Sequence, residues 1–83
     1  MNVSFVNSVP HGEFAEISVL TNGWQNRFQS LVSQRRPIKF DFYPMPHLPI
    51  EVCQSVTQRG YRDVVLQQDQ WQHFFIPGPV QNS

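Results

Sequence analysis

The chain has 83 residues and a mass of 9.7 kDa, a size typical of one domain and too small for two. Six Lys and Arg balance six Asp and Glu, 14% of the residues are charged and 40% are hydrophobic, which excludes disorder as the default state. The zero formal charge and the pI near 6.8 argue against a general polyanion binder. We therefore expect a single domain over residues 1–83, with 77–83 as a flexible tail.

Signals for export or membrane insertion are missing from the sequence. The first fifteen residues lack a basic start followed by an apolar stretch, and no apolar run approaches the roughly 18 residues that span a bilayer. Cys53 is the single cysteine, whereas a small secreted domain usually carries several disulfides. These features predict a soluble, cytoplasmic protein in a reducing compartment.

Alternating apolar residues predict two strands in the N-terminal part of the chain. The first is short and depends on Val3 and Phe5. After a turn over residues 7–12, which contains Pro and Gly, the second strand is expected over residues 13–20.

A helix is expected next, over residues 22–34, with capping chemistry at 21–23. Its apolar residues recur at i, i+4, i+7 and i+8, and they are Trp24, Phe28, Leu31 and Val32. Arg35 and Arg36 follow where cations meet the negative end of the helix dipole. Pro37 then prevents the helix from continuing.

The second half of the chain predicts one more helix between strands. Residues 38–43 alternate with strict period two, which indicates a strand. Three prolines within 44–49 prevent regular strand pairing, and Pro49 suits the first turn of a helix that ends at Gly60. A final pair of strands, joined by residues 67–70, completes the chain.

The resulting order, β-β-α-β-α-β-β, predicts an α+β fold. Two helices cannot cover both faces of a four- or five-stranded sheet, so we expect a two-layer sandwich with both helices on one face of a mainly antiparallel sheet. After the first strand, the order resembles that of small sulfur-carrier proteins. That family has a Cys-Pro-x-Pro motif at the start of its first helix, where this chain reads Thr21-Asn22-Gly23-Trp24. The resemblance is one of topology and implies no activity or site residue here.

Strand alternation decides which side chains lie on the uncovered face of this sheet. The side chains predicted to face the helices are Ala15, Ile17, Val19, Ile38, Phe40, Phe42, Val64, Leu66, Phe74 and Ile76. Those predicted to point away are Phe14, Leu20, Tyr43, Val65, Trp71, His73 and Phe75. An exposed aromatic surface of this kind marks a partner site, unless the N-terminal strand, the loop 44–49 or the tail folds over it.

We therefore predict a non-catalytic interaction protein: an adaptor, subunit or inhibitor of a larger protein complex. Its partner would dock on the charge-poor aromatic face. The predicted contact residues are the anchors Trp71, Phe75 and Tyr43, the flanking His73, Val65 and Phe14, and the orienting cations Arg62 and Arg36. Because residues 71–76 are rich in strand formers and carry no charge with a neutral histidine, a homodimer formed by this strand at a sheet edge is a further expectation.

The alternative function is a single-stranded nucleic-acid binder. Aromatic sheet faces flanked by arginines bind RNA by stacking, and Trp71, Phe75 and Tyr43 would be the platforms. Against this, the net charge is zero and no RNP-like run is present. Five Arg to one Lys is a ratio that favours a protein partner.

Catalysis has the weakest support in the sequence. The H-x-E spacing at His11 and Glu13 lacks the P-C-x-x-C run of zinc deaminases, and no glycine pattern forms a phosphate loop. A thiol enzyme built on Cys53 and His47 is a third hypothesis, but Cys53 lies within the apolar stripe of the second helix. No cofactor, metal or catalytic residue is predicted.

Overall fold

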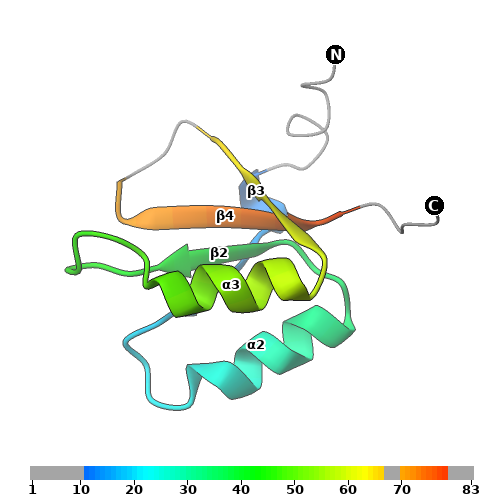
Figure 1. Ribbon diagram of the computed structural model, residues 1–83, viewed down its shortest axis with the longest axis horizontal. Helices are drawn as coiled ribbons and strands as arrows, with labels where there is room; N and C mark the ends of the chain where they lie inside the picture. Colours follow the sequence, from blue (N-terminus) through cyan, green and yellow to red (C-terminus); the bar gives the residue numbers. More distant parts are fainter. Residues whose placement is uncertain (1–10, 67–69, 79–83) are drawn as a thin grey trace.

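A four-stranded mixed sheet and two α-helices make up the part of the chain described by the computed structural model, residues 11–66 and 70–78 (Figure 1). In chain order the elements are η1 (His11–Glu13), β1 (Ala15–Ser18), α2 (Trp24–Ser33), β2 (Ile38–Asp41), α3 (Ile50–Gln58), β3 (Tyr61–Val64) and β4 (Gln72–Pro77). The predicted α+β class is confirmed. The strand predicted at Val3 and Phe5 lies outside the described residues.

The strands are arranged in the order β1-β2-β4-β3. β1 and β2 run parallel, with Ala15 opposite Ile38, whereas β4 runs antiparallel to both of its neighbours. Phe75 of β4 lies opposite Ile38 on one side and Asp63 on the other. Because β4 is hydrogen-bonded on both sides, the prediction that 71–76 forms an exposed edge for a homodimer is wrong.

The first helix keeps its predicted position and ends as expected, but its N-terminus differs from the prediction. Gly23 is the N-cap at φ 78° and no side chain caps the helix; instead the Trp24 N–H donates to the Thr21 carbonyl at 3.1 Å. After the last turn, Arg35 takes a left-handed φ of 55°, a conformation that costs a non-glycine residue about 1 kcal/mol. Its Nη2 donates to the Gly78 carbonyl at 2.8 Å, which holds it there.

Both helices share one core with the same face of the sheet (Figure 1). The buried members of this helix-side core are Ala15, Ile17, Phe28, Leu31, Ile38, Phe40, Phe42, Leu48, Val52, Val56, Tyr61 and Phe75. Phe40 lies at its centre with 0% exposure, and its ring centroid is 6.0 Å from that of Phe28 and 5.8 Å from that of Phe75. The predicted orientation of β1 and β2 is therefore confirmed.

A second, smaller cluster lies on the other face of the sheet. Its buried members are Phe14, Val64, Phe74 and Ile76, with Leu66 partly buried against them. The rings of Phe14 and Phe74 meet edge to face at 5.1 Å. The prediction that Val64, Leu66, Phe74 and Ile76 face the helices is thus wrong. Residues 74–76 are all buried because β4 is covered on both faces, so alternation could not reveal its orientation.

Ordered structure continues past the predicted start of the tail. Pro77 belongs to β4, and the Gly78 N–H donates to the Gly60 carbonyl at 2.7 Å. A Cβ at position 78 would lie 3.0 Å from that same oxygen, so glycine is needed for this close approach. Gly60 follows α3 with φ 84°, as its predicted role in ending the helix requires. Residues 79–83 lie outside the described part of the chain.

Tyr61 ties β3 to the end of α2, and this contact gives a pH-dependent prediction. Its hydroxyl donates to the Arg36 carbonyl at 2.8 Å, and burial raises the pKa of this phenol. Tyr61→Phe should lower the free energy of unfolding by about 1 kcal/mol at neutral pH. Because the folded-state pKa is the higher one, this contribution is present below about pH 10 and is lost as the pH rises further.

Urea titrations of both proteins from neutral pH to about pH 11 test this assignment. The difference between wild type and Tyr61→Phe should shrink above about pH 10. A difference that stays constant through the alkaline range would show that the hydroxyl does not make this bond.

Candidate docking site

The structure separates the residues that were predicted to form one aromatic face. Phe75 is 1% exposed and packs under the helices, and Phe14 is 8% exposed in the cluster on the opposite face. Both were expected on the surface, and for both that expectation is wrong. The cause is the orientation of β4, in which Phe75 shares the helix side of the sheet with Phe40.

Two of the predicted anchors do lie together, although Trp71 is partly buried against the helix-side core and does not point away from the helices as predicted. The ring of Tyr43, which is 59% exposed, meets the ring of Trp71 edge to face at a centroid distance of 5.1 Å. The backbone fixes this arrangement, because the Phe42 N–H donates to the Trp71 carbonyl at 3.0 Å. The Tyr43 N–H in turn donates to Oδ1 of Asp41 at 3.1 Å. An aromatic pair therefore stands at the end of the sheet where β2 stops and β4 begins.

The other predicted contact residues lie elsewhere. Val65 is 85% exposed just after β3, and His73 is partly buried beside Phe75, on which it stacks at 5.0 Å. Arg62 belongs to β3 and Arg36 follows α2. Neither arginine is at the end that carries Tyr43 and Trp71.

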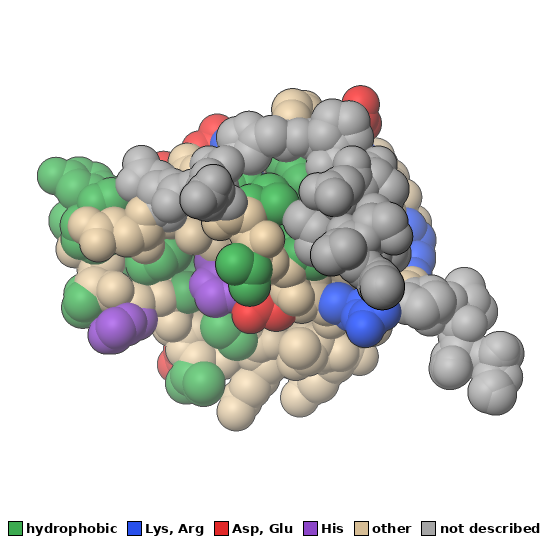
Figure 2. Space-filling view, turned by 90° about the horizontal axis from the view of Figure 1, so that it is seen from above, with side chains coloured by type: hydrophobic (Ala, Val, Ile, Leu, Met, Phe, Trp, Pro, Cys, Tyr) green, Lys and Arg blue, Asp and Glu red, His purple; other side chains and the backbone are tan. Residues whose placement is uncertain are grey.

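Arginines gather at the opposite end of the molecule, where both helices finish. Lys and Arg atoms are seen mainly at the right of Figure 2, and hydrophobic atoms line the left edge of the same view. Arg59, just after α3, extends its guanidinium over the ring of Phe28 at 5.3 Å from the centroid. Cations here compensate the negative ends of the helix dipoles. Stacking platforms flanked by arginines, as the nucleic-acid hypothesis requires, are therefore not assembled in the described part of the chain.

An apolar groove of about 410 Å³ lies at the end of the molecule where both helices begin. This is the left side of Figure 1, where β2 ends and the loops 19–23 and 42–49 lie. The residues that line the groove are Val19, Leu20, Trp24, Gln25, Met45, Pro49, Glu51 and Val52. We call this feature the groove.

The parallel pairing of β1 and β2 creates the groove. Each of these strands is followed by a loop and a helix, so the two loops leave the sheet side by side. The wall is firm because Trp24 is packed on Phe28 and Phe40 at centroid distances of 5.9 and 6.1 Å.

Exposed apolar side chains follow the same two loops. Leu20, a lining residue, is 55% exposed, and Ile50 at the start of α3 is 67% exposed. The groove was not predicted from the sequence, in which residues 13–20 were expected to form a strand and residues 44–49 to interrupt strand pairing. The available signal was the pattern of two successive strand–helix units, which favours parallel strands whose following loops leave the same end of the sheet.

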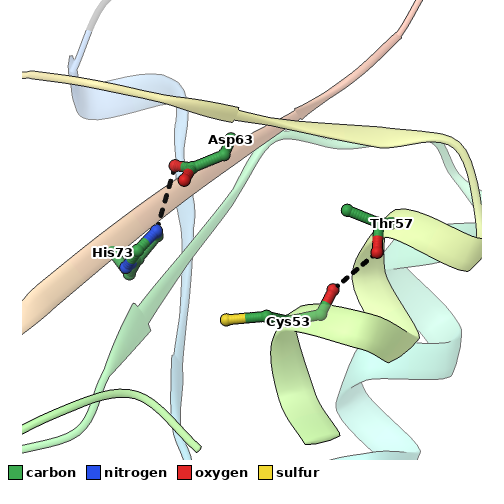
Figure 3. A network of polar contacts seen from close by, with 4 residues as sticks. All are labelled: Cys53, Thr57, Asp63 and His73. Atoms are coloured by element: carbon green, nitrogen blue, oxygen red, sulfur yellow. Dashed lines mark hydrogen bonds and ion pairs between the residues drawn. The ribbon is translucent and has the colours of Figure 1, made fainter. Parts of the chain in front are cut away.

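A thiol, an imidazole and a carboxylate form the second group of interest (Figure 3). Nε2 of His73 lies 3.0 Å from Oδ1 of Asp63, and the Cys53 side chain points from α3 toward the part of the sheet that carries this pair. Burial and the Asp63 charge both raise the pKa of the Cys53 thiol. A catalytic thiol needs the opposite shift. His47, the partner considered in the sequence, is exposed in the loop before α3.

Alkylation of Cys53 should accordingly be slow in the native protein. At about pH 8 we expect iodoacetamide to react more slowly with the folded chain than with the chain in urea, because the raised pKa leaves less thiolate and partial burial limits access to the sulfur. Asp63→Asn should speed the native reaction, because it removes a repelling charge. A native rate equal to the unfolded rate would contradict this account of the thiol.

Comparison with known proteins adds no relative: no protein-family model, no curated protein and no solved structure matches the chain. Neither helix within residues 11–66 and 70–78 is long and apolar enough to cross a membrane. Over the same residues, no three His, Cys, Asp or Glu side chains are grouped so that they could hold a metal ion.

Proposed function

We propose that this chain is a small non-catalytic interaction protein, an adaptor, subunit or inhibitor of a larger complex, which binds an apolar segment of a protein partner in the groove. The observation that carries the proposal is the groove itself: an apolar hollow of about 410 Å³ that the exposed Leu20 helps to line, with Ile50 exposed in the adjoining first turn of α3. Exposed apolar side chains around a concave surface mark protein-binding sites. The single thiol, Cys53, suits a cytoplasmic setting for such a protein.

The free energy gained by burying apolar side chains indicates how much of this end of the molecule a partner must cover. Fully burying one Leu or Ile side chain contributes about 1.5–3 kcal/mol. Micromolar affinity needs about 8 kcal/mol after the cost of association is met. Leu20 and Ile50 alone fall short of that, so a partner is expected to extend over the aromatic pair of Tyr43 and Trp71 as well.

Peptides selected from a random phage-displayed library on the wild-type protein give a direct test. A selected peptide should lose at least about tenfold in affinity for Leu20→Ser, because the residue is a central contact. Val65→Ser is the control: it removes an apolar side chain that is 85% exposed, against 55% for Leu20, from another part of the surface and should change the affinity of a groove-binding peptide less than about twofold. Equal affinity for wild type and Leu20→Ser would contradict the proposal.

Salt dependence separates this proposal from nucleic-acid binding. Glu51 is the single charged residue among those that line the groove, so peptide affinity should change little between about 50 and 200 mM salt. Binding of single-stranded RNA or DNA with an affinity that falls steeply over that range would favour the alternative function.

A further inference from the structure

The two edges of the sheet differ in how their backbone groups are used. β1 forms one edge and β3 the other. In β1, Ala15 and Val19 donate toward β2, so the backbone of Glu16 and Ser18 points outward. Both outward carbonyls are already occupied: that of Glu16 accepts from Nε of Arg27 at 3.0 Å, and that of Ser18 accepts from the Thr21 N–H at 3.1 Å. The outward carbonyls of the β1 edge are therefore used by its own chain.

The outer edge of β3 is open over part of its length. The Gly78 N–H donates to the Gly60 carbonyl, so Gly60 and Gly78 form a hydrogen-bonded pair of the antiparallel ladder between β3 and β4. Hydrogen-bonded and non-hydrogen-bonded pairs alternate along such a ladder. Arg62 and Val64 thus bond to β4, and the backbone of Asp63 points outward, as does that of Val65 just beyond the strand. Within residues 11–66 and 70–78, the N–H and C=O groups of Asp63 and Val65 have no hydrogen-bond partner.

Exposure confirms that this stretch is reachable. The Asp63 side chain is 55% exposed and Val65 is 85% exposed, whereas Tyr61 at the start of the strand is 3% exposed. A hollow of about 180 Å³ lies beside the open stretch and is lined by Asp63 and Val65 together with His73. A strand laid along β3 could place a side chain in this hollow.

We propose that the open edge at Asp63 and Val65 binds an extended segment of a partner protein, which adds a strand to β3 and carries a Lys or Arg opposite Asp63. Main-chain bonds of an added strand supply affinity, and alternate side chains supply specificity. Opposite charges directly across two strands stabilise the pair. The Asp63 side chain is 55% exposed, and its Oδ1 lies 3.0 Å from Nε2 of His73, which leaves Oδ2 to meet a cation of the added strand. This surface is separate from the groove, so the proposal goes beyond the function proposed above.

A second copy of the chain fits this edge less well than a partner. Antiparallel self-pairing centred on Asp63 would place two carboxylates directly opposite each other, which is destabilising. The shifted register, with Asp63 opposite Val65 of the second copy, leaves the carboxylate without a cation across the strand. The exposed carboxylate of Asp63 therefore favours an extended segment of another protein that carries a cation at this one position, rather than a second copy of the chain.

The test uses a synthetic peptide of alternating Thr and Val with one central Lys, and a matched peptide with Glu in place of Lys. Amide hydrogen exchange of the full-length protein is followed by NMR. The Lys peptide should slow exchange at Asp63 and Val65 and should bind at least about threefold more tightly than the Glu peptide. Val65→Pro, which removes the N–H that an added strand needs, should abolish this protection. Val65→Ala keeps that N–H and should preserve the protection.

A charge swap covers the case in which Val65→Pro fails to fold: Asp63→Lys should reverse the preference between the two peptides. Leu20→Ser should leave this binding unchanged, so failure here and failure of the groove are distinguishable. The proposal is overturned if millimolar Lys peptide leaves exchange at Asp63 and Val65 unchanged, or if Asp63→Lys does not alter the preference. It is also overturned if light scattering shows a dimer that Val65→Pro dissociates, because a second copy would then occupy the edge.

Discussion

Replacing Phe75 by alanine is expected to lower the free energy of unfolding by about 3–5 kcal/mol, the usual cost of removing a fully buried aromatic side chain. The residue is 1% exposed, and its ring packs on Phe40 at 5.8 Å and on His73 at 5.0 Å. Small domains are stable by about 5–15 kcal/mol in total, so a large part of the stability is lost. Urea unfolding followed by circular dichroism measures the change.

Val65→Ala is the control for this substitution. Val65 is 85% exposed, so its truncation should change stability by less than about 0.5 kcal/mol. If Phe75→Ala were as mild as Val65→Ala, Phe75 would lie on the surface, as strand alternation alone predicts, and the orientation of β4 described above would be wrong.

Phe74→Ala is expected to cost a comparable amount, at least about 3 kcal/mol. Phe74 is 3% exposed and meets Phe14 edge to face on the side of the sheet away from the helices. Neighbouring residues in a strand point to opposite faces of the sheet. A large loss of stability on truncating either Phe74 or Phe75 would therefore show that the strand is buried on both faces. The same urea titration gives the value.

Gln72→Ala provides the comparison on the same strand and the same face. Gln72 is half-buried and polar, and we expect its truncation to change stability by less than about 0.5 kcal/mol. A Phe74→Ala variant as stable as Gln72→Ala would show that this face is open to solvent and that the second cluster is not part of the folded core.

Local periodicity was enough to predict the helices and the central strand. α2 has its buried residues Phe28 and Leu31 on one face, and its spacing of 3.6 residues is visible in the sequence alone. β2 alternates because Ile38 and Phe40 face the helices while Lys39 lies on the other side. Each of these elements buries only one of its faces. Under that condition the spacing of apolar residues in the sequence shows which face points to the core.

The orientation of β4 could not be predicted in this way. Residues 74–76 are apolar in succession, so either alternate set could belong to the helix-side core. The deciding contacts come from Phe14, far away in the sequence, which forms the second cluster with Phe74. Long-range packing of this kind leaves no local periodicity in a strand that is covered on both faces.

The candidate site was predicted only in part for a related reason. Tyr43 and Trp71 meet because each lies within two residues of a strand terminus, and their aromatic character marked them in the sequence. Leu20 was predicted only as a residue of the uncovered sheet face, and Met45 was not singled out, because the two line one groove only when β1 and β2 lie parallel and adjacent. Strand pairing is a property of the whole fold, and alternation within one strand says nothing about its neighbours.

The most direct test of the proposed function is an NMR structure, or a set of intermolecular NOEs, for a library-selected peptide bound to the protein. An apolar peptide side chain should give NOEs to the Trp24 indole and to the Leu20 methyl groups, which line the groove together. NOEs confined to residues outside the groove, such as those around Arg59 at the other end, would contradict the assignment.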